Sequence, residues 1–222
     1  MNLALFDLDG TLIPGDSDHA FGQFMVEIGW ADGEAWARRN DEFFAQYQAG
    51  SLNLGEYIAF ATSVWRSRPL EEALSMRERF MGEVMRPLMR DNARALVRQH
   101  QERGDLVAIV TATNEFVTTP IAEAFGVPDL IAVQLERDAA GHYNGAIRGV
   151  PSFQAGKIVR VEQWLAGQGR TLKDFEHVHF YSDSVNDLPL MERVSHPVAT
   201  NPSEALAQIA KARGWPILNL FA

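Results

Sequence analysis

The stretch Leu3-Ala-Leu-Phe-Asp7-Leu-Asp9-Gly10-Thr11-Leu12 decides the fold of this chain. Its first four residues are apolar and predict a short buried strand, which two carboxylates follow directly. Side chains at positions i and i+2 of an extended chain point the same way, so Asp7 and Asp9 are expected to share one space at the strand's carboxyl end. Like charges this close repel, and burying them is costly unless a cation or a proton intervenes. The stretch therefore predicts a divalent-metal site, an acid/base site, or both.

The composition of the 222 residues is that of an ordinary globular protein, with 46% hydrophobic and 22% charged residues. Cysteine is absent, which excludes disulfides, thiolate nucleophiles and cysteine metal sites. The formal net charge of −9 argues against nucleic-acid binding, which relies on basic patches. No window has the roughly 20 apolar residues of a membrane span, and the N-terminus lacks a signal-peptide pattern. We therefore expect a cytoplasmic protein.

Residues 16–86 have the pattern of a helical segment. Aromatic and apolar side chains recur there at helical spacing, as at Phe21, Phe24 and Ile28. We expect about four helices around a small core of their own. From residue 16 to residue 85 the chain carries twelve acids and six arginines, a net charge of −6. This charge is typical of a solvated helical surface, and it also fits a substrate with a cationic end.

From Asp91 onward, predicted helices alternate with short apolar strands, which is the pattern of a parallel sheet covered on both faces. We therefore predict an α/β protein whose doubly wound parallel sheet is formed by residues 1–15 and 87–222, with an α-helical cap inserted at 16–86. The strands expected after the cap are 107–110, a hairpin of 131–136 and 142–147, 178–181, 197–199 and 217–220.

Polar side chains follow three of the predicted strands. Asp7 and Asp9 follow the first strand, and Thr111 and Asp183 each come directly after a later one. Ligands of such sheets bind at the carboxyl ends of the strands. Lys157 begins a predicted helix, where the positive end of the backbone favours anions. Three carboxylates converging on one crevice suit Mg²⁺, and a lysine and a hydroxyl add donors for phosphate oxygens. The set predicts phosphoryl transfer.

Each of these residues alone also has a structural explanation. Thr111 alone is typical of a hydroxyl that caps a turn at a strand end, and Lys157 alone is typical of a surface lysine. Asp183 and Asp187 alone are typical of helix caps. Only their joint order along the chain favours a shared site.

Four motifs occur in order along the chain: Asp7-Leu-Asp9-Gly-Thr-Leu, Val110-Thr111 (continuing as Ala112-Thr113-Asn114), Gly156-Lys157 and Ser182-Asp183-Ser-Val-Asn186-Asp187. They resemble those of the haloacid dehalogenase superfamily, and the similarity spans essentially the whole chain. The helical insertion after the first motif and the hairpin before the lysine resemble the phosphoserine phosphatase-like branch.

Asp16 stands where phosphoserine phosphatases carry glutamate. The stretch Gly15-Asp16-Ser17-Asp18-His19, the second motif and the fourth motif together resemble a sister subgroup that has histidinol-phosphate phosphatase-like members.

The resemblance implies a phosphatase that hydrolyses phosphomonoesters through an aspartyl-phosphate. It implies that Asp7 is the nucleophile that attacks phosphorus. It implies that Asp9 protonates the leaving alcohol and then activates the water that hydrolyses the intermediate. Thr111 and Lys157 are implied to hold the phosphoryl group, with Lys157 also offsetting the charge of Asp7.

The resemblance also implies Mg²⁺ as the cofactor. Its ligands are implied to be Asp7, Asp183 and Asp9, the last through its backbone carbonyl, while Asp187 orients Lys157 or water at the metal. Further contacts to the phosphate or the substrate are expected from Ala112, Asn186, Asp16, Asp18 and His19.

Two questions stay open at the level of sequence. Asp16 and Asp18 either pair with an ammonium or imidazolium group of the substrate or form a simple turn. The first alternative predicts an amino-alcohol phosphate, such as histidinol phosphate or phosphoserine. The same motifs also serve a phosphotransferase that uses an alcohol acceptor, or a non-catalytic phosphate-binding module. We expect a small-molecule phosphomonoester as partner, no nucleic acid or membrane, and a monomer or homodimer.

Overall fold

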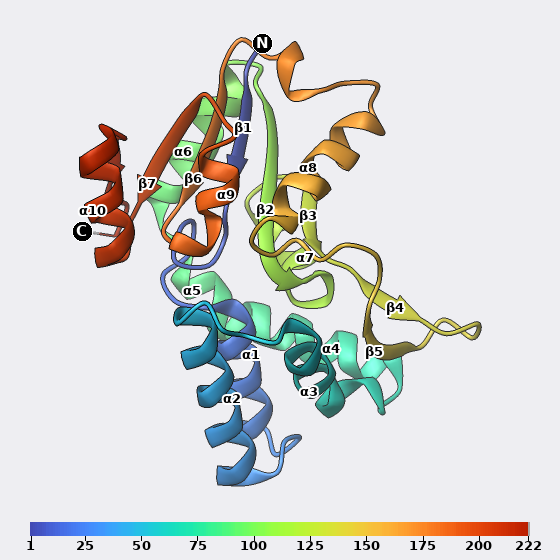
Figure 1. Cartoon of the computed structure of the whole chain (residues 1–222). Helices are drawn as coiled ribbons and strands as arrows, with labels where there is room; N and C mark the ends of the chain where they lie inside the picture. Colours follow the sequence, from blue (N-terminus) through green and yellow to red (C-terminus); the bar gives the residue numbers. More distant parts are fainter. Residues whose placement is uncertain (222) are drawn as a thin grey trace.

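The computed structural model describes residues 1–221 and contains a six-stranded sheet in the order β3-β2-β1-β6-β7-β8 (Figure 1). All neighbouring strands in it are parallel, which confirms the predicted doubly wound α/β fold. β1, the central strand, is fully buried because parallel strands are covered on both faces. The strands of this sheet are β1 (Leu3–Phe6), β2 (Leu106–Asn114), β3 (Asp129–Val133), β6 (Val178–Ser182), β7 (His196–Thr200) and β8 (Ile217–Leu218).

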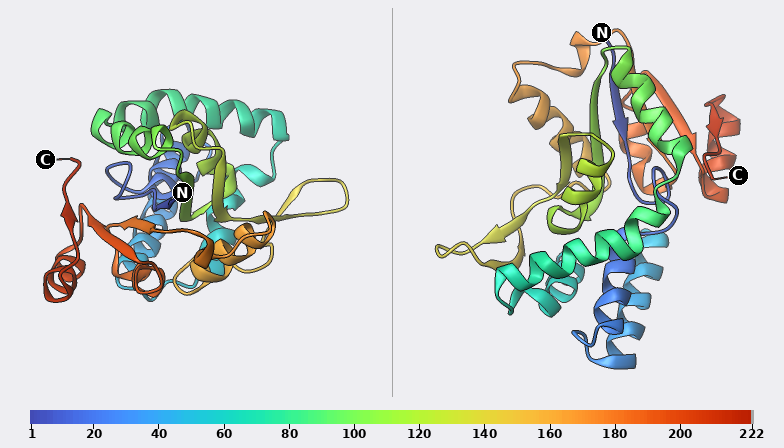
Figure 2. Two further views of the ribbon diagram at one scale, coloured as in Figure 1. Left: turned by 90° about the horizontal axis from the view of Figure 1, so that it is seen from above. Right: turned by 180° about the vertical axis from the view of Figure 1, so that it is seen from behind.

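Helices cover both faces of the sheet. Alternate residues of β1 face opposite sides, so that Ala4 and Phe6 belong to one apolar cluster and Leu3 and Leu5 to the other. The first cluster includes residues of α6 and α7, and the second includes residues of α8, α9 and α10. In Figure 1, α6 lies behind the sheet, and the reverse view of Figure 2 shows it in front. These helices are α6 (Asp91–Glu102), α7 (Glu115–Ala124), α8 (Gly156–Ala166), α9 (Leu188–Met191) and α10 (Glu204–Arg213).

Residues 16–90, called the cap segment below, are mostly helical and lie beyond the carboxyl end of β1 (Figure 1). Some of its aromatic side chains pack on one another, as Phe43 does on Tyr57 and Phe60, and others pack on the rest of the fold. Trp65 stacks on Phe116 of α7 with ring centroids 3.9 Å apart, and one apolar cluster spans both regions. The division at 16–86 therefore stays a prediction. The helices of the segment are α1 (Ser17–Glu27), α2 (Gly33–Gln48), α3 (Leu54–Arg66), α4 (Leu70–Phe80), the π-helix η1 (Met81–Met85) and α5 (Arg86–Leu88).

Two strands differ from the expectation. The strand expected at 131–136 is divided, because its buried apolar half is part of β3 and pairs with β2. Only the more polar β4 (Leu135–Arg137) pairs with β5 (Tyr143–Ile147) to form the hairpin. β2 continues to Asn114 with a register irregularity after Val110, so Thr111 lies inside the strand and not after it.

Pro120 lies inside α7 without ending the helix. Proline has no N–H, so the carbonyl of Phe116, four residues earlier, lacks its helical donor. Arg77 of α4 donates to that carbonyl over 3.3 Å. A residue of the cap segment thus satisfies a backbone group of the sheet's flanking helix. None of the helices found in residues 1–221 is long and apolar enough to cross a membrane.

Candidate active site

Lys157, at the start of α8, forms a buried ion-pair triad with two carboxylates. Its Nζ lies 2.9 Å from Asp7 Oδ1 and 2.8 Å from Asp187 Oδ2, and all three side chains are almost completely buried. Burial alone would lower the pKa of Lys157, but the charges of Asp187 and Asp7 outweigh that effect and raise it. The lysine is therefore a fixed cation between two sequence-distant motifs, as their joint order predicted.

Asp7 and Asp183 face a common hydroxyl at the carboxyl ends of β1 and β6. Thr11 Oγ1 donates to Asp183 Oδ1 over 3.2 Å and lies 3.5 Å from Asp7 Oδ2. Burial raises the pKa of Asp7 to about 7, although Lys157 acts against this. Burial and the charges of Asp7 and Asp187 raise the pKa of Asp183. One lysine thus does not neutralise this group of carboxylates, and a further positive charge fits here.

Gly10 and Asn201 hold the turn between Asp7 and the cap segment. Gly10 has a φ of +73°, and a Cβ atom at this position would lie 2.3 Å from Asp183 Oδ2. Only glycine therefore allows Asp183 to approach the turn. Asn201 Nδ2 donates to the carbonyls of Gly10 and Thr11, each over 3.1 Å. The turn is thereby held from two sides.

The Asp9 carboxylate has a different set of partners from that of Asp7. It accepts hydrogen bonds from the Ser17 N–H over 2.6 Å, from Thr113 Oγ1 over 2.9 Å and from Thr111 Oγ1 over 3.4 Å. Burial, followed by the charge of Asp16, raises the pKa of Asp9 to about 6. An acid held by neutral donors in this way is suited to carry a proton.

The Asp9 carboxylate faces partners other than those of Asp7 and Asp183, and the expected magnesium ligands stay a prediction. Residues 1–221 contain no group of three histidine or acidic side chains placed to hold a metal ion. The reason is local, because side chains at i and i+2 share a side only while the chain stays extended. β1 ends at Phe6, and the backbone turns directly after Asp7 and Asp9. Asp7 and Asp183 are brought together, whereas the Asp9 side chain is engaged by Ser17 and Thr113.

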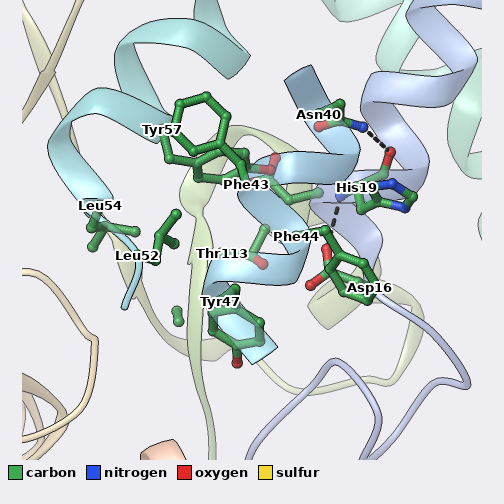
Figure 3. Close-up of a pocket in the computed structure, with 12 residues that line it drawn as sticks. Asp16, His19, Asn40, Phe43, Phe44, Tyr47, Leu52, Leu54, Tyr57 and Thr113 are labelled. Atoms are coloured by element: carbon green, nitrogen blue, oxygen red, sulfur yellow. Dashed lines mark hydrogen bonds between the residues drawn. The ribbon is translucent and has the colours of Figure 1, made fainter. Parts of the chain in front are cut away.

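A pocket lies between the cap segment and the end of β2 (Figure 3). Thr113, which donates to Asp9, is part of its wall, so the pocket adjoins the acid/base candidate. The pocket combines acidic groups with aromatic walls. Its lining residues are Asp16, Asp18, His19, Asn40, Phe43, Phe44, Tyr47, Leu52, Leu54, Tyr57, Ala112 and Thr113.

The remaining residues expected at the substrate have structural partners as well. Asp16 accepts a hydrogen bond from the His19 N–H over 2.8 Å and so caps α1, while it also lines the pocket. His19 Nε2 lies 2.7 Å from Asp41 Oδ1. Asn186, expected on the phosphate side, donates instead to the carbonyl of Tyr47 over 3.0 Å and links the core to α2.

Several residues of the site were not singled out from the sequence. Thr11 and Thr113 contact the catalytic carboxylates, and Asn201 holds the turn after β1. Ser182 donates to Asp187 Oδ2 over 2.8 Å. All of these residues except Asn201 lie within or next to the four motifs. Their nearness to a motif is the only feature of the sequence that points to them. Asn201 carries no such signal, because it acts across 190 residues of sequence.

The chain was compared with known proteins. Residues 4–192 match the family described as haloacid dehalogenase-like hydrolase. The chain is 42% identical over 218 residues to "Histidinol-phosphatase" of Neisseria meningitidis serogroup C, covering 98% of each chain. It is 28% identical over 219 residues to "Phosphoserine phosphatase SerB1" of Mycobacterium tuberculosis, covering 96% of this chain and 69% of the relative.

Solved structures agree with the fold. A crystal structure of a protein of unknown function from Bordetella pertussis Tohama I has a TM-score of 0.93 and 49% identity, with 99% of both chains covered. A substrate-bound phosphoserine phosphatase complex has a TM-score of 0.67 at 18% identity, and the match covers 97% of this chain and 91% of the other. At this identity the similarity is one of fold. Since the family match spans most of the sequence and the relatives are phosphatases, this chain belongs to the haloacid dehalogenase-like hydrolase family and is a phosphatase.

Proposed function

We propose that this phosphatase hydrolyses a small phosphomonoester through an aspartyl-phosphate formed on Asp7, with Mg²⁺ as its cofactor. The observation that carries the proposal is the buried contact of Lys157 Nζ with Asp7 Oδ1 at 2.9 Å. This lysine stabilises the anionic form of the nucleophile and offsets the charge of an incoming phosphoryl group.

The reaction has two displacement steps at phosphorus. An Asp7 oxygen attacks phosphorus, the bond between phosphorus and the alcohol oxygen breaks, and Asp9 gives its proton to that oxygen. Water then attacks phosphorus, its proton passes to Asp9, and the bond between Asp7 and phosphorus breaks. The pKa of Asp9, raised to about 6, supports its role as the proton carrier. The hydroxyl of Thr111, 3.4 Å from Asp9 Oδ2, is a donor beside the reacting atoms.

The residues beside Asp7 fit Mg²⁺. They offer only oxygen donors, which this ion prefers, and Asp183 occupies the space that a Cβ atom of residue 10 would fill. Asp7 and Asp183 would hold the ion together with the backbone carbonyl of Asp9. When bound, Mg²⁺ supplies positive charge that neutralises phosphate oxygens during transfer.

Histidinol phosphate is the first candidate substrate. The relative named as a histidinol-phosphatase shares 42% identity with this chain over nearly its whole length. The acidic pocket that adjoins Asp9 supports a leaving group with cationic nitrogen, which histidinol provides. Phosphoserine is the second candidate, but its carboxylate would enter a pocket that contains Asp16 and Asp18 and no lysine or arginine.

The test is phosphate release from histidinol phosphate, phosphoserine and a generic aryl phosphate by the purified protein. We expect kcat/KM for histidinol phosphate to exceed that for phosphoserine by at least about tenfold, the effect of roughly 1.4 kcal/mol of binding. A chelator is expected to stop release, and added Mg²⁺ to restore it. Absence of release from all three esters contradicts the proposal. Adding alcohols separates the phosphotransferase alternative, which yields phosphorylated acceptor in place of free phosphate.

A further inference from the structure

Asp18 is a buried carboxyl group that the proposed reaction does not use. Its side chain is 5% exposed, and its Oδ1 accepts a hydrogen bond from Asn114 Nδ2 over 3.1 Å. Its Oδ2 has no hydrogen-bond partner within residues 1–221. An unpaired oxygen on a buried carboxyl group lowers the stability of a fold, so its retention indicates a partner that arrives with a ligand.

The surroundings of Asp18 indicate the chemistry of that ligand. Asp18 lines the same pocket as Phe43, Tyr47 and Tyr57, whose rings appear with the other lining residues in Figure 3. Burial and then the charge of Asp18 raise the pKa of Tyr57 well above its usual value, so its hydroxyl stays protonated beside the carboxyl group. Aromatic walls favour a flat ring, and an unpaired carboxylate oxygen favours an N–H donor or a cationic nitrogen.

Asp16 and Asp18 both line this pocket, and Thr113 in the pocket wall donates to Asp9. The charges of Asp16 and Asp9 also act on the pKa of Asp18. A leaving group that extends from the phosphate into this pocket therefore meets both acidic side chains.

We propose that Asp18 is a specificity-determining residue that binds a ring nitrogen of the leaving group. The site thereby selects phosphate esters of alcohols that end in a flat nitrogen heterocycle. Asn114 positions the carboxyl group through Oδ1, which leaves Oδ2 for the ligand. This inference rests on the proposed function and narrows its substrate class from amino-alcohol esters to those with a second nitrogen on a ring.

The test compares two esters, histidinol phosphate and phenylalaninol phosphate. Both contain a phosphate, an amine and a flat ring, and only the first has ring nitrogens. We expect the wild-type kcat/KM ratio between them to be about 100 or more, because a site with a buried polar group discriminates strongly against an analogue that leaves it unpaired. In Asp18→Asn the ratio is expected to fall to about 10 or less, since the neutral amide no longer attracts a cationic ring.

Two controls separate this effect from a general disturbance. Asp32→Asn makes the same chemical change at an exposed position of the cap segment, outside the pocket, and is expected to leave the ratio unchanged. The melting temperature of Asp18→Asn is expected to be no lower than that of the wild type. Oδ1 still accepts from Asn114, and burial, which raises the pKa of Asp18 to about 8, already disfavours the charged carboxylate in the absence of ligand. Tyr57→Phe, which removes only the neighbouring hydroxyl, is expected to lower the ratio severalfold and serves if Asp18→Asn does not fold.

The free alcohols give a second readout that needs no variant. Histidinol is expected to inhibit aryl phosphate hydrolysis at roughly one hundredth of the concentration that phenylalaninol requires. Equal inhibition by the two alcohols overturns the inference, and so does a wild-type ester ratio near 1. An unchanged ratio in folded Asp18→Asn overturns it as well, while hydrolysis of both esters leaves the proposed function standing. A wild-type protein that hydrolyses no ester overturns both.

Discussion

Ionisable side chains gather at both ends of the central strands, carboxylates at one end and histidines at the other. The two groups limit charge repulsion in different ways. At the carboxyl ends of β1 and β6, Asp7 and Asp183 meet at the Thr11 hydroxyl, and Lys157 is the cation beside Asp7. At the amino end of β6, His177 and His179 lie close to histidines of other elements. Parallel strands create both clusters, because residues at equivalent positions of neighbouring strands lie side by side.

At the amino end of β6, His179 avoids repulsion by staying neutral. His179 has ring centroids of His100 and His196 within 5.2 and 4.9 Å. Burial, and then these neighbours, lower the pKa of His179 to about 4. His100 is held between Asp105, at 2.8 Å, and the Tyr181 hydroxyl, at 2.9 Å. Loss of the His179 proton is sufficient to avoid repulsion here, since the proposed reaction does not use this side chain.

The carboxylate end cannot use the same solution, because a nucleophile must stay anionic. A buried lysine keeps that charge in place, and a metal ion is proposed to add to it. A histidine with no proposed catalytic role can lose its proton, whereas a carboxylate that acts as a nucleophile needs a cation to balance its charge. Four substitutions test this difference between the two clusters.

Asp7→Asn has the largest expected effect. We expect kcat/KM to fall by about 10⁴-fold or more, because the amide is a poor nucleophile. The melting temperature is expected to stay within a few degrees of the wild type, since Lys157 keeps its contact with Asp187. Phosphate release and thermal unfolding measure the two effects. Activity within tenfold of the wild type contradicts the assignment of the nucleophile.

Lys157→Met, unlike Asp7→Asn, is expected to lower folding stability strongly. Removing the cation leaves Asp7 and Asp187 buried without their partner, which is expected to cost about 3–5 kcal/mol of folding free energy. Lys173→Met, an exposed control, is expected to change stability by less than about 0.5 kcal/mol. Urea unfolding measures both. Equal midpoints for the two variants contradict a role for Lys157 in holding the carboxylates.

Thr113→Val tests the neutral donors around Asp9. Loss of the 2.9 Å hydrogen bond is expected to lower kcat/KM about fivefold, as one such hydrogen bond is worth roughly 1 kcal/mol. The Ser17 N–H still holds Asp9, so activity is not expected to vanish. Steady-state kinetics give the value. A variant with unchanged kcat/KM shows that Thr113 does not position Asp9 for the reaction.

His179→Gln has the smallest expected effect, and it concerns stability alone. The folded-state pKa of about 4 lies below the ordinary value of 6.5, so neither state binds this proton above pH 6.5. Between pH 6.5 and 4 the unfolded chain binds a proton that the folded chain does not, and stability therefore falls as the pH falls. The glutamine variant is expected to lose less stability over this range. Melting temperatures at pH 7 and pH 5 measure the difference, and equal losses contradict the shift.

The residues proposed to act in catalysis could largely be named from the sequence, whereas their hydrogen-bond partners could not. Asp7, Lys157 and Asp183 carry their signal in local order, each next to a predicted strand or helix start. Asn201 and Thr113 acquire their roles only through contacts with Gly10 and Asp9 across the fold. No local pattern encodes such contacts, because they depend on where the chain returns.

The amino-acid sequence by itself determined the alternation of helices and strands, the parallel sheet and the set of motifs at its edge, since each follows from periodicity and composition over a few residues. Only the tertiary structure decided that the Asp9 carboxylate joins Ser17 and Thr113, that the 131–136 strand is divided, and that Asp18 keeps an unpaired oxygen. These outcomes depend on which distant groups compete for the same buried space, and that competition is settled only when the whole chain packs.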